Sequence, residues 1–241
     1  MTMVNRTVSA TPTRPVRKEV VRTVDVKRTY LAGGSEVHAL DGINVTVPEG
    51  ILVAFKGRSG SGKTTLLNIL GGLDKPSSGS VYIDGEPLAN MSEQEITNLR
   101  RKRIGFVFQS FALIPTFSAF ENVELPLRIA GAEPAARAAR TNRCLEMVGL
   151  QKWAEHRPYE MSGGQQQRIA IAHSLSNHPA LILADEPTGE LDSKTGRQIL
   201  NLFKNIANED RITVIIATHD PVIEEFATVI YELKDGKITR A

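Results

Sequence analysis

The sequence predicts an α/β protein built around a sheet with parallel strands. Residues 181–184 and 212–217 are short, near-continuous apolar runs, as expected of strands that are buried on both faces of such a sheet. Residues 57–64 have the pattern G-x-x-x-x-G-K-[ST], and they lie between a strand-like segment and a helix-like one. This alternation of strand, loop and helix predicts that ligands bind at the carboxyl ends of the strands.

The composition is that of an ordinary soluble globular protein. The 241 residues, 41% hydrophobic and 23% charged, suffice for one large domain or two associated lobes. A formal net charge of +2 gives no argument for nucleic-acid binding. The single cysteine, Cys144, excludes an intramolecular disulfide and is expected to be a small buried residue of a helix in a reducing cytosol. Without an apolar run of roughly 20 residues or a secretory signal, a cytosolic chain is expected that reaches a membrane only through a partner.

The N-terminal part is expected to contain a tail and several strands. Residues 1–20 are rich in basic residues, proline and threonine, which predicts a flexible basic tail ahead of a folded domain over 21–241. The elements expected next are strands at 21–30, 43–47, 51–56 and 81–84, a turn at 48–50 and a helix at 63–70.

The rest of the chain is expected to be helical before it returns to the sheet. The expected elements are a strand at 104–108 ending at Gln109, helices at 119–130 (with Pro126 inside) and 135–148, and a closing hairpin of strands at 228–233 and 237–239. Ser162 is suited to cap a further helix over 162–176. Residues 110–160 are expected to form an inserted helical subdomain.

The glycine-rich loop is suited to hold the phosphates of a nucleotide. Its glycines, Gly57, Gly60 and Gly62, allow backbone N–H groups to turn inward around the phosphates. Lys63 is expected to reach the outer phosphates, and the hydroxyl of Thr64 to hold Mg²⁺. The expected nucleotide-binding segment is completed by Arg58, Ser59, Ser61 and Thr65.

Two carboxylates follow the apolar run at 181–184. A buried strand would deliver Asp185 to the phosphate loop, where it can hold Mg²⁺ directly or through water. Glu186 can polarise the water that attacks the γ-phosphate, as a base or by orienting it. The alternative is that the two carboxylates simply end a strand and open a turn.

The chain contains Ser-Gly-Gly-Gln at residues 162–165 in addition to the phosphate loop. With this combination of motifs, it resembles the ATP-binding cassette of ABC transporters. The resemblance covers about 21–240 with the motifs in the same order. It implies a P-loop NTPase fold with a mixed core sheet, an N-terminal antiparallel β part and an inserted α-helical subdomain. Motifs at 37–42, 66–74, 104–109 and 121–126 are similar to the lipoprotein-release and macrolide-exporter (LolD- and MacB-like) branch, to which FtsE-type cell-division cassettes are closely related.

The resemblance implies roles for further residues. Gln109 would ligate Mg²⁺ or the attacking water, and His219 would contact the γ-phosphate beside the catalytic Glu186 and Lys63. Tyr30 would stack on the adenine ring, although an ordinary core aromatic is the alternative at this position.

The signature residues Ser162, Gly163, Gly164 and Gln165 open a helix, which makes them an anion site. The resemblance implies that this site caps the γ-phosphate bound to a second copy. Two identical cassettes would then sandwich two ATP molecules head to tail, and hydrolysis would release them and move a partner.

Three residues depart from the family pattern, and one segment is a candidate docking site. Arg58 stands where proline is common, Glu190 replaces an asparagine of a loop at the expected dimer interface, and His173 stands where arginine is usual, which puts a helix–core contact in doubt. Of the apolar residues in 110–120, two are expected to pack the subdomain onto the sheet. The resemblance implies that the others, Phe111 and Phe117, line a groove for a short helix of the membrane subunit.

The sequence therefore predicts an ATP hydrolase that binds ATP and Mg²⁺ and powers a membrane permease. An FtsE-like cell-division ATPase is the alternative. ABC ATPases that act on DNA or ribosomes are disfavoured, because only 99 residues separate Lys63 from Ser162 and the chain has one cassette. A non-hydrolysing scaffold is disfavoured because Glu186 and His219 are both present. No nucleic-acid partner is expected, and the cytoplasmic face of the plasma membrane is the expected location.

Overall fold

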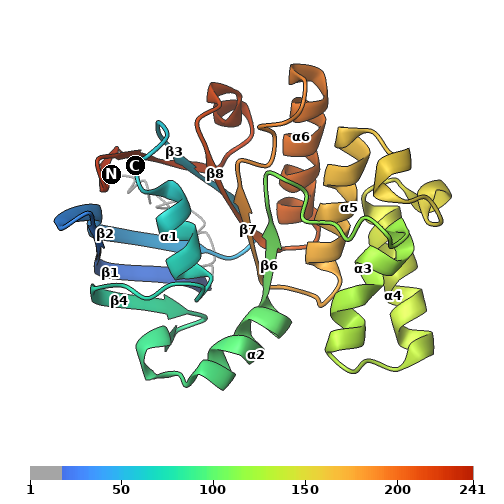
Figure 1. Ribbon diagram of the computed structural model, residues 1–241, viewed down its shortest axis with the longest axis horizontal. Helices are drawn as coiled ribbons and strands as arrows, with labels where there is room; N and C mark the ends of the chain where they lie inside the picture. The colour runs from blue at the N-terminus through green and yellow to red at the C-terminus, as the bar shows by residue number, and fades with distance from the viewer. Residues whose placement is uncertain (1–17, 241) are drawn as a thin grey trace, which may run out of the picture.

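The structure, a computed structural model, describes residues 18–240, which form two β-sheets with helices around them (Figure 1). The core sheet has the strand order β10-β9-β3-β8-β7-β6. Five of its strands run parallel, and β10 pairs antiparallel with β9 at one edge. These strands are β3 (Leu52–Lys56), β6 (Ile104–Val107), β7 (Leu181–Asp185), β8 (Thr213–Thr218), β9 (Val229–Lys234) and β10 (Lys237–Arg240). The predicted mixed core sheet is confirmed.

A second, antiparallel sheet is formed mainly by the N-terminal segment. Its strands, in the order β2-β1-β4-β5, are β1 (Glu19–Ala32), β2 (Ser35–Pro48), β4 (Ser78–Ile83) and β5 (Glu86–Pro87). β2 is much longer than the strand predicted at 43–47, because it pairs with β1 as far as the register Ala32–Ser35. β1 begins at Glu19, inside the tail predicted at 1–20, and Val20 is buried in this sheet. The rest of that prediction concerns residues 1–17, which lie outside the described residues.

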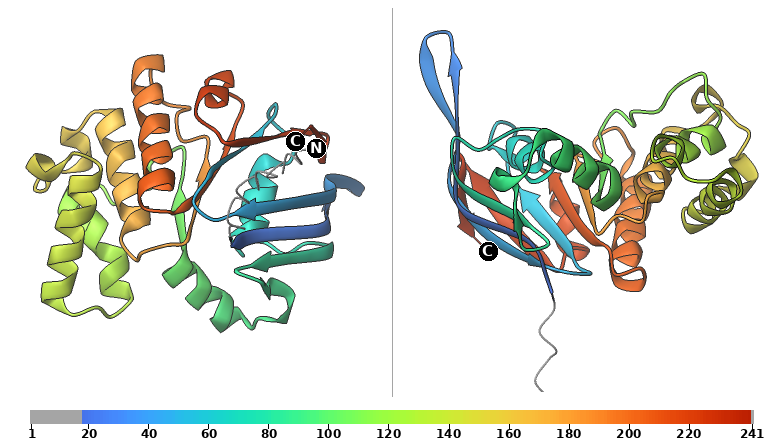
Figure 2. Two further views of the ribbon diagram at one scale, coloured as in Figure 1. Left: turned by 180° about the vertical axis from the view of Figure 1, so that it is seen from behind. Right: turned by 90° about the horizontal axis from the view of Figure 1, so that it is seen from below.

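The core sheet is buried on both faces, which explains its near-continuous apolar strands. Leu52 and Ile182 belong to the cluster that contains α5 (Gly163–Leu175) and α6 (Ser193–Glu209). Val53 and Leu183 face the other way, into the cluster that contains α1 (Lys63–Leu70) and the antiparallel sheet. The views in Figures 1 and 2 show these layers, with α1 on one side of the core strands and α5 and α6 on the other.

The predicted helical subdomain lies at the end of the molecule away from the antiparallel sheet (Figure 1). α3 (Ala119–Ile129) and α4 (Pro134–Met147) pack against each other and against α5. Both helices agree with the predicted ranges to within a residue, and Pro126 lies inside α3. Two short 3₁₀ segments, η2 (Gln151–Trp153) and η3 (Pro158–Glu160), lead to α5. Cys144 is buried in α4, and burial raises the pKa of its thiol to about 11, as expected of an inert small residue.

Two helices were missing from the sequence prediction although both have sequence signals. α2 (Glu93–Arg103) begins with a capping box in which the side chains of Ser92 and Glu95 each bond the other's backbone N–H. α6 begins at the cap Asp192, and its apolar residues recur with helical spacing on a buried face. The remaining short segments are η1 (Leu88–Asn90) and η4 (Pro221–Glu225). Within residues 18–240, no helix combines the length and the apolar character needed to cross a membrane.

The loop that precedes α3 is held by one buried amide, that of Asn122. Its Oδ1 accepts a hydrogen bond from the N–H of Ile114 at 2.8 Å, and its Nδ2 lies within 3.2 Å of the carbonyls of Ile114, Phe117 and Ser118. Asn122 is only 1% exposed, so water cannot replace these bonds. The amide therefore fixes the path of the chain between β6 and the helical subdomain.

Replacing Asn122 with alanine should lower the free energy of unfolding by about 2–4 kcal/mol, because buried backbone groups at 114–118 lose their partner. Urea denaturation monitored by circular dichroism measures this difference. Asn201 is exposed on α6, so Asn201→Ala is a matched control that should change stability by no more than about 0.5 kcal/mol. Equal stability of the two variants would contradict this role of Asn122.

Candidate functional site

Three adjacent strands of the core sheet end at the same level and deliver the residues of the site. The parallel register pairs Lys56 of β3 with Thr218 of β8, and Asp185 of β7 with Ala217 of β8. The chain continues from these ends into the phosphate loop, Glu186 and His219. Residues more than 100 positions apart in the sequence therefore meet at one edge of the sheet, as expected for the carboxyl ends of parallel strands.

The phosphate loop packs closely between β2 and the β9–β10 turn. This close approach leaves no space for side chains at Gly57 and Gly62 and therefore requires glycine there. A Cβ atom on Gly57 would lie 2.3 Å from the carbonyl oxygen of Leu233, and one on Gly62 would lie 2.4 Å from that of Ala39. Gly62 also has a φ of 103°, which side chains disfavour. At Gly60 the space is open, but φ is 77°. Larger residues at 57 and 62 would therefore displace the loop.

The loop leads into a helix terminus that is open to an anion. The N-cap residue of α1, Gly62, has no side chain to bond the first N–H groups of the helix. Lys63 is 5% exposed, and its Nζ donates to the carbonyls of Gly57 at 2.8 Å and Arg58 at 3.0 Å. The ammonium group and the free N–H groups together favour the binding of phosphate.

A cavity of about 430 Å³ opens above the loop and collects most of the predicted site residues. It is lined by Ser59, Gly60, Gly62, Lys63, Thr64, Thr65, Gln109, Asp185, Glu186 and His219, together with Val37, His38 and Ala39 of β2. The last three were not predicted from the sequence. They belong to the motif at 37–42, but their place at the cavity becomes visible only once the β1–β2 register, which pairs Val37 with Tyr30, is known.

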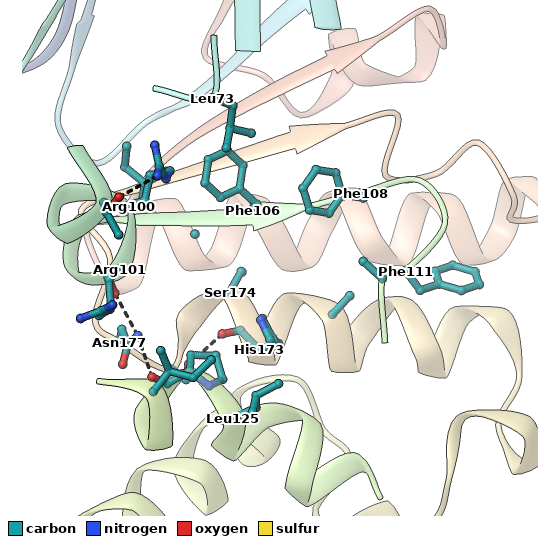
Figure 3. Close-up of a pocket in the computed structure, with 18 residues that line it drawn as sticks. Leu73, Arg100, Arg101, Phe106, Phe108, Phe111, Leu125, His173, Ser174 and Asn177 are labelled. Carbon is teal, nitrogen blue, oxygen red and sulfur yellow. Dashed lines mark hydrogen bonds between the residues drawn. The ribbon is translucent and has the colours of Figure 1, made fainter. Parts of the chain in front are cut away.

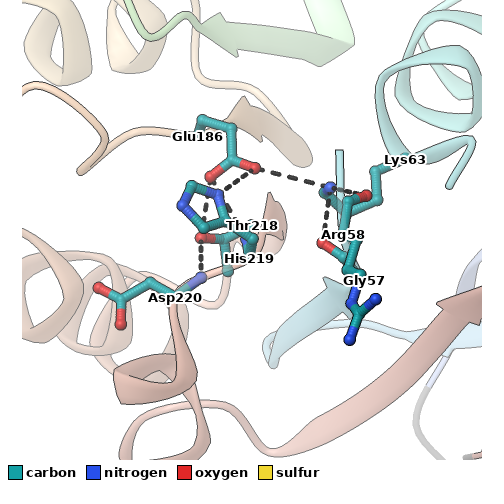
Figure 4. A network of polar contacts seen from close by, with 7 residues as sticks. All are labelled: Gly57, Arg58, Lys63, Glu186, Thr218, His219 and Asp220. Atoms are coloured by element: carbon teal, nitrogen blue, oxygen red, sulfur yellow. Dashed lines mark hydrogen bonds and ion pairs between the residues drawn. The ribbon is translucent and has the colours of Figure 1, made fainter. Parts of the chain in front are cut away.

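Glu186 is the centre of a polar network (Figure 4). Its Oε1 lies 3.0 Å from Nδ1 of His219 and 3.6 Å from Nζ of Lys63. Its Oε2 accepts a hydrogen bond from the hydroxyl of Thr218 at 3.1 Å. The backbone of Glu186 has a φ of 45°, a conformation held by the bond from its N–H to the carbonyl of Ala217. The carboxylate is thus fixed beside the only buried lysine of the described chain.

Asp185 and its neighbours fit a divalent cation. Burial raises the pKa of Asp185, while the hydroxyl of Thr64 and the charge of Lys63 oppose this shift. Its Oδ1 is buried and has no hydrogen-bond partner among residues 18–240. Asp185, Thr64 and Gln109 together provide the oxygen ligands that Mg²⁺ prefers. A cation would also offset the cost of keeping this carboxylate charged in a buried position.

The signature residues do not reach this cavity. Ser162 caps α5, and its side chain and that of Gln165 bond each other's backbone N–H groups. Gly163 lies against Leu191, and Gly164 against Thr195, where a Cβ atom would come within 2.4 Å of the threonine methyl. α5 packs on the face of the core sheet opposite to α1 (Figure 1). The structure thus separates the signature from the phosphate loop of the same chain.

Tyr30 lies near the site without lining it. Its hydroxyl donates to Asp74 at 2.6 Å, and the guanidinium of Arg28 lies 4.4 Å from the centre of its ring. Tyr30 pairs directly with Val37, whose exposed side chain borders the cavity. Adenine stacking on Tyr30 stays a prediction, and it would have to use the ring face that Arg28 leaves free.

An apolar groove of about 470 Å³ lies between α2, β6, α3 and α5 (Figure 3). Leu73, Phe108 and Ile129, three of the exposed large apolar side chains of residues 18–240, all line it. Among residues 18–240, the charged residues in its wall are Arg100 and Arg101, and none of those that line it is acidic.

The groove contains one of the two aromatic residues of the docking prediction. Phe111 lines it, whereas Phe117 lies outside it, in a turn whose N–H donates to the carbonyl of Ile114. Leu113 and Phe120 pack against the core, as expected for two of these residues.

The departure at His173 leaves the contact between α5 and its neighbours intact. His173 Nδ1 lies 2.8 Å from the carbonyl of Asn122 in α3, so the ring joins the two helices. Burial lowers the pKa of His173, which keeps the ring neutral at neutral pH. The ring also forms part of the groove wall.

Comparisons with known proteins agree with this arrangement. The ABC transporter family model matches residues 40–189. The ABC transporter ATP-binding protein MJ0796 of Methanocaldococcus jannaschii is 48% identical over 92% of this chain and 96% of its own length. The macrolide export ATP-binding/permease protein MacB of Syntrophobacter fumaroxidans is 43% identical over 91% of this chain and 31% of its own length. A dimeric post-hydrolysis structure of MJ0796 bound to ADP and Pi has a TM-score of 0.83, with 46% identity over 91% of this chain and 97% of that chain.

The sequence similarity extends over almost the whole described chain, and it includes both sheets and the helical subdomain. The fold places a phosphate loop, a strand-end carboxylate pair and a histidine at one cavity, and a glycine-rich helix N-terminus outside it. These are the features that the motifs predict for an ATP-binding cassette. The chain belongs to the ABC transporter family, and it is the ATP-binding, ATPase component of such a transporter.

Proposed function

We propose that this cassette hydrolyses ATP between two copies of itself and thereby drives a separate membrane permease. The observation that carries the proposal is the separation of the two halves of the expected site. Lys63, Glu186 and His219 share one cavity, whereas Ser162 and Gly163 lie outside it. A nucleotide held by one copy would meet a signature helix only from another copy. The dimeric structure of the relative MJ0796 supports this arrangement.

In the proposed reaction the γ-phosphate rests on the N–H groups of α1 and on Lys63. The ammonium group is already fixed by two loop carbonyls, so it needs no large rearrangement to oppose the phosphate charge. Glu186, held by Thr218 and His219, orients the attacking water and takes its proton. His219 stabilises the carboxylate and reaches toward the phosphate. Mg²⁺, held by Thr64, Gln109 and Asp185 with phosphate oxygens, would neutralise charge that develops on the phosphates.

Dimerisation follows from the same geometry. The N-terminus of α5 presents glycine N–H groups and the positive end of a helix dipole, which suits the γ-phosphate of the opposite copy. ATP would hold two copies together through this contact. Loss of the γ-phosphate on hydrolysis would remove it and let the copies separate.

The apolar groove is the proposed docking site for the permease. Its exposed apolar residues suit the apolar face of a short helix, and Arg100 and Arg101 suit an acidic residue on that helix. Docking there would place the cassette at the cytoplasmic face of the membrane. The relative MacB is named as a macrolide export ATP-binding/permease protein, which supports export as the proposed role. The proposed cargo classes are extracytoplasmic lipoproteins, peptides or drugs.

Lys63→Ala should lower ATP affinity at least about tenfold and abolish turnover, since a hydrogen bond to a charged group contributes about 1.5–3 kcal/mol. Isothermal titration with ATP and a phosphate-release assay measure the two effects. Lys75→Ala removes an exposed lysine that is paired with Glu93 outside the cavity, so it should leave both values unchanged. Near-normal turnover in Lys63→Ala would refute the assigned site.

Glu186→Gln keeps the size and most contacts of the side chain but removes the proton acceptor. Hydrolysis should fall about 10²–10⁴-fold, and ATP should then accumulate in a stable dimer. Size-exclusion chromatography with ATP and Mg²⁺ would show the dimer, and ADP should not produce it. A variant that stays monomeric at saturating ATP would count against the sandwich.

Ile129→Asp places a charge on the exposed rim of the groove, far from the phosphate loop in the fold. The isolated cassette should keep its basal ATPase activity, while assembly with the permease should weaken. Co-purification of the complex and transport assays test this. Tyr159→Asp, at an equally exposed apolar residue outside the groove, is the control and should assemble normally. Normal assembly of Ile129→Asp would place the docking site elsewhere.

A further inference from the structure

Two residues that depart from the family pattern have charged, exposed and unpaired side chains. One lies in the phosphate loop and the other beside the signature helix, the two parts of the proposed dimer site. Arg58 lies in the phosphate loop, and Glu190 lies in the loop that leads from the carboxylate pair into α6. Neither side chain forms a hydrogen bond or an ion pair within the described part of the chain. Their charges are opposite, so each is a suitable ion-pair partner for the other.

Arg58 is directed away from the catalytic network. Figure 4 shows its guanidinium pointing away from Lys63 and Glu186, while its backbone carbonyl accepts a bond from Lys63. Gly57 and Ser59, its neighbours, are fixed parts of the loop and the cavity edge, so the side chain projects from an anchored backbone. Arg58 lines a hollow beside the loop together with Glu232 and Asp235, but neither carboxylate pairs with it in the described chain.

Glu190 is anchored just as firmly beside the signature helix. Leu191 follows it and lies 3.4 Å from the position of a Cβ atom on Gly163. On its other side, a Cβ atom on Gly189 would lie 3.1 Å from the amide nitrogen of Gln109, a residue that lines the cavity. The exposed carboxylate is therefore carried next to the N-terminus of α5, the element that the proposed function seats on the phosphate loop of the second copy.

We propose that Arg58 of one copy pairs with Glu190 of the other when two ATP-bound cassettes associate. The inference rests on the proposed sandwich. If the N-terminus of α5 covers the opposite phosphate loop, then Glu190, beside that N-terminus, meets Arg58, beside that loop. Twofold symmetry forms the contact twice in each dimer. The pair stabilises the closed dimer and selects a second copy of this chain over cassettes that carry proline and asparagine at these positions.

A charge-swap experiment tests the pair, with every protein carrying Glu186→Gln so that ATP is not consumed. Arg58→Glu alone places like charges at both contacts of a homodimer, and so does Glu190→Arg alone. Each should raise the dimer dissociation constant at least about tenfold at low salt, because attraction is replaced by repulsion twice. Sedimentation velocity with saturating ATP and Mg²⁺ measures this constant.

The decisive sample is an equimolar mixture of these two variants. In a mixed dimer, the first contact joins the two substituted residues and the second joins native Arg58 to native Glu190, so both contacts are attractive. The mixture should form dimers, as should the double variant, and both effects should shrink with added salt. A pair formed within one chain could not be restored by mixing, so this result is specific to a contact between copies.

The controls separate failure of the pair from failure of the sandwich. The parent Glu186→Gln protein must dimerise with ATP. If it does not, the sandwich itself is overturned and the pair with it. If the parent dimerises and the mixture does not, or if both single variants dimerise like the parent, the pair is overturned. Lys152→Glu reverses an exposed charge in η2 and should dimerise like the parent.

Neutral variants keep the test valid if a charge reversal prevents folding, which circular dichroism would reveal. Arg58→Gln and Glu190→Gln should each weaken the dimer by a smaller factor. Their combination should be no weaker than either one alone, because each removes the same contact. Additive weakening would overturn the pair.

Discussion

The parallel pairing of β3, β8 and β7 is the constraint on which the rest of the site depends. Its register brings Lys56, Thr218 and Asp185 to one edge of the sheet. The functional residues come directly after these three strand ends in the sequence. The pairing is stable because both faces of these strands are covered, by α1 and the antiparallel sheet on one side and by α5 and α6 on the other. A slip of one residue would exchange these faces and separate the phosphate loop from the carboxylates.

The site is polar and partly buried, and this affects its charges. Lys63 is nearly inaccessible and is compensated by two carbonyls and by Glu186 at 3.6 Å. Asp185 is less well compensated, since burial raises its pKa and one of its oxygens has no partner in the described chain. A triphosphate with its cation would complete both sets of interactions. Binding energy is thus available from groups that the fold has already desolvated.

One segment belongs both to the nucleotide cavity and to the apolar groove. Phe108 lines the groove, and the next residue, Gln109, lines the cavity. The chain then passes through the loop held by Asn122 into α3, whose residues Pro126 and Ile129 form another wall of the groove. A shift of Gln109 on nucleotide binding or loss would therefore act on the groove through covalent continuity and through a rigid hydrogen-bonded loop. This continuity gives the proposed coupling to a permease a physical route.

The sequence by itself determined the elements whose signals are local. The strands at 181–184 and 212–217, the helix 63–70 and the cap at Ser162 were predictable, because burial on two faces, glycine geometry and capping each require particular residue types. α2 and α6 have comparable local signals, a capping box and an amphipathic pattern respectively.

Only the tertiary structure decided which residues share a cavity. The contribution of Val37, the position of Phe117 outside the apolar groove and the separation of Ser162 from Lys63 depend on strand register and on the face of the sheet that each helix covers. Those are relations between segments far apart in the chain, and no local pattern of residue types encodes them.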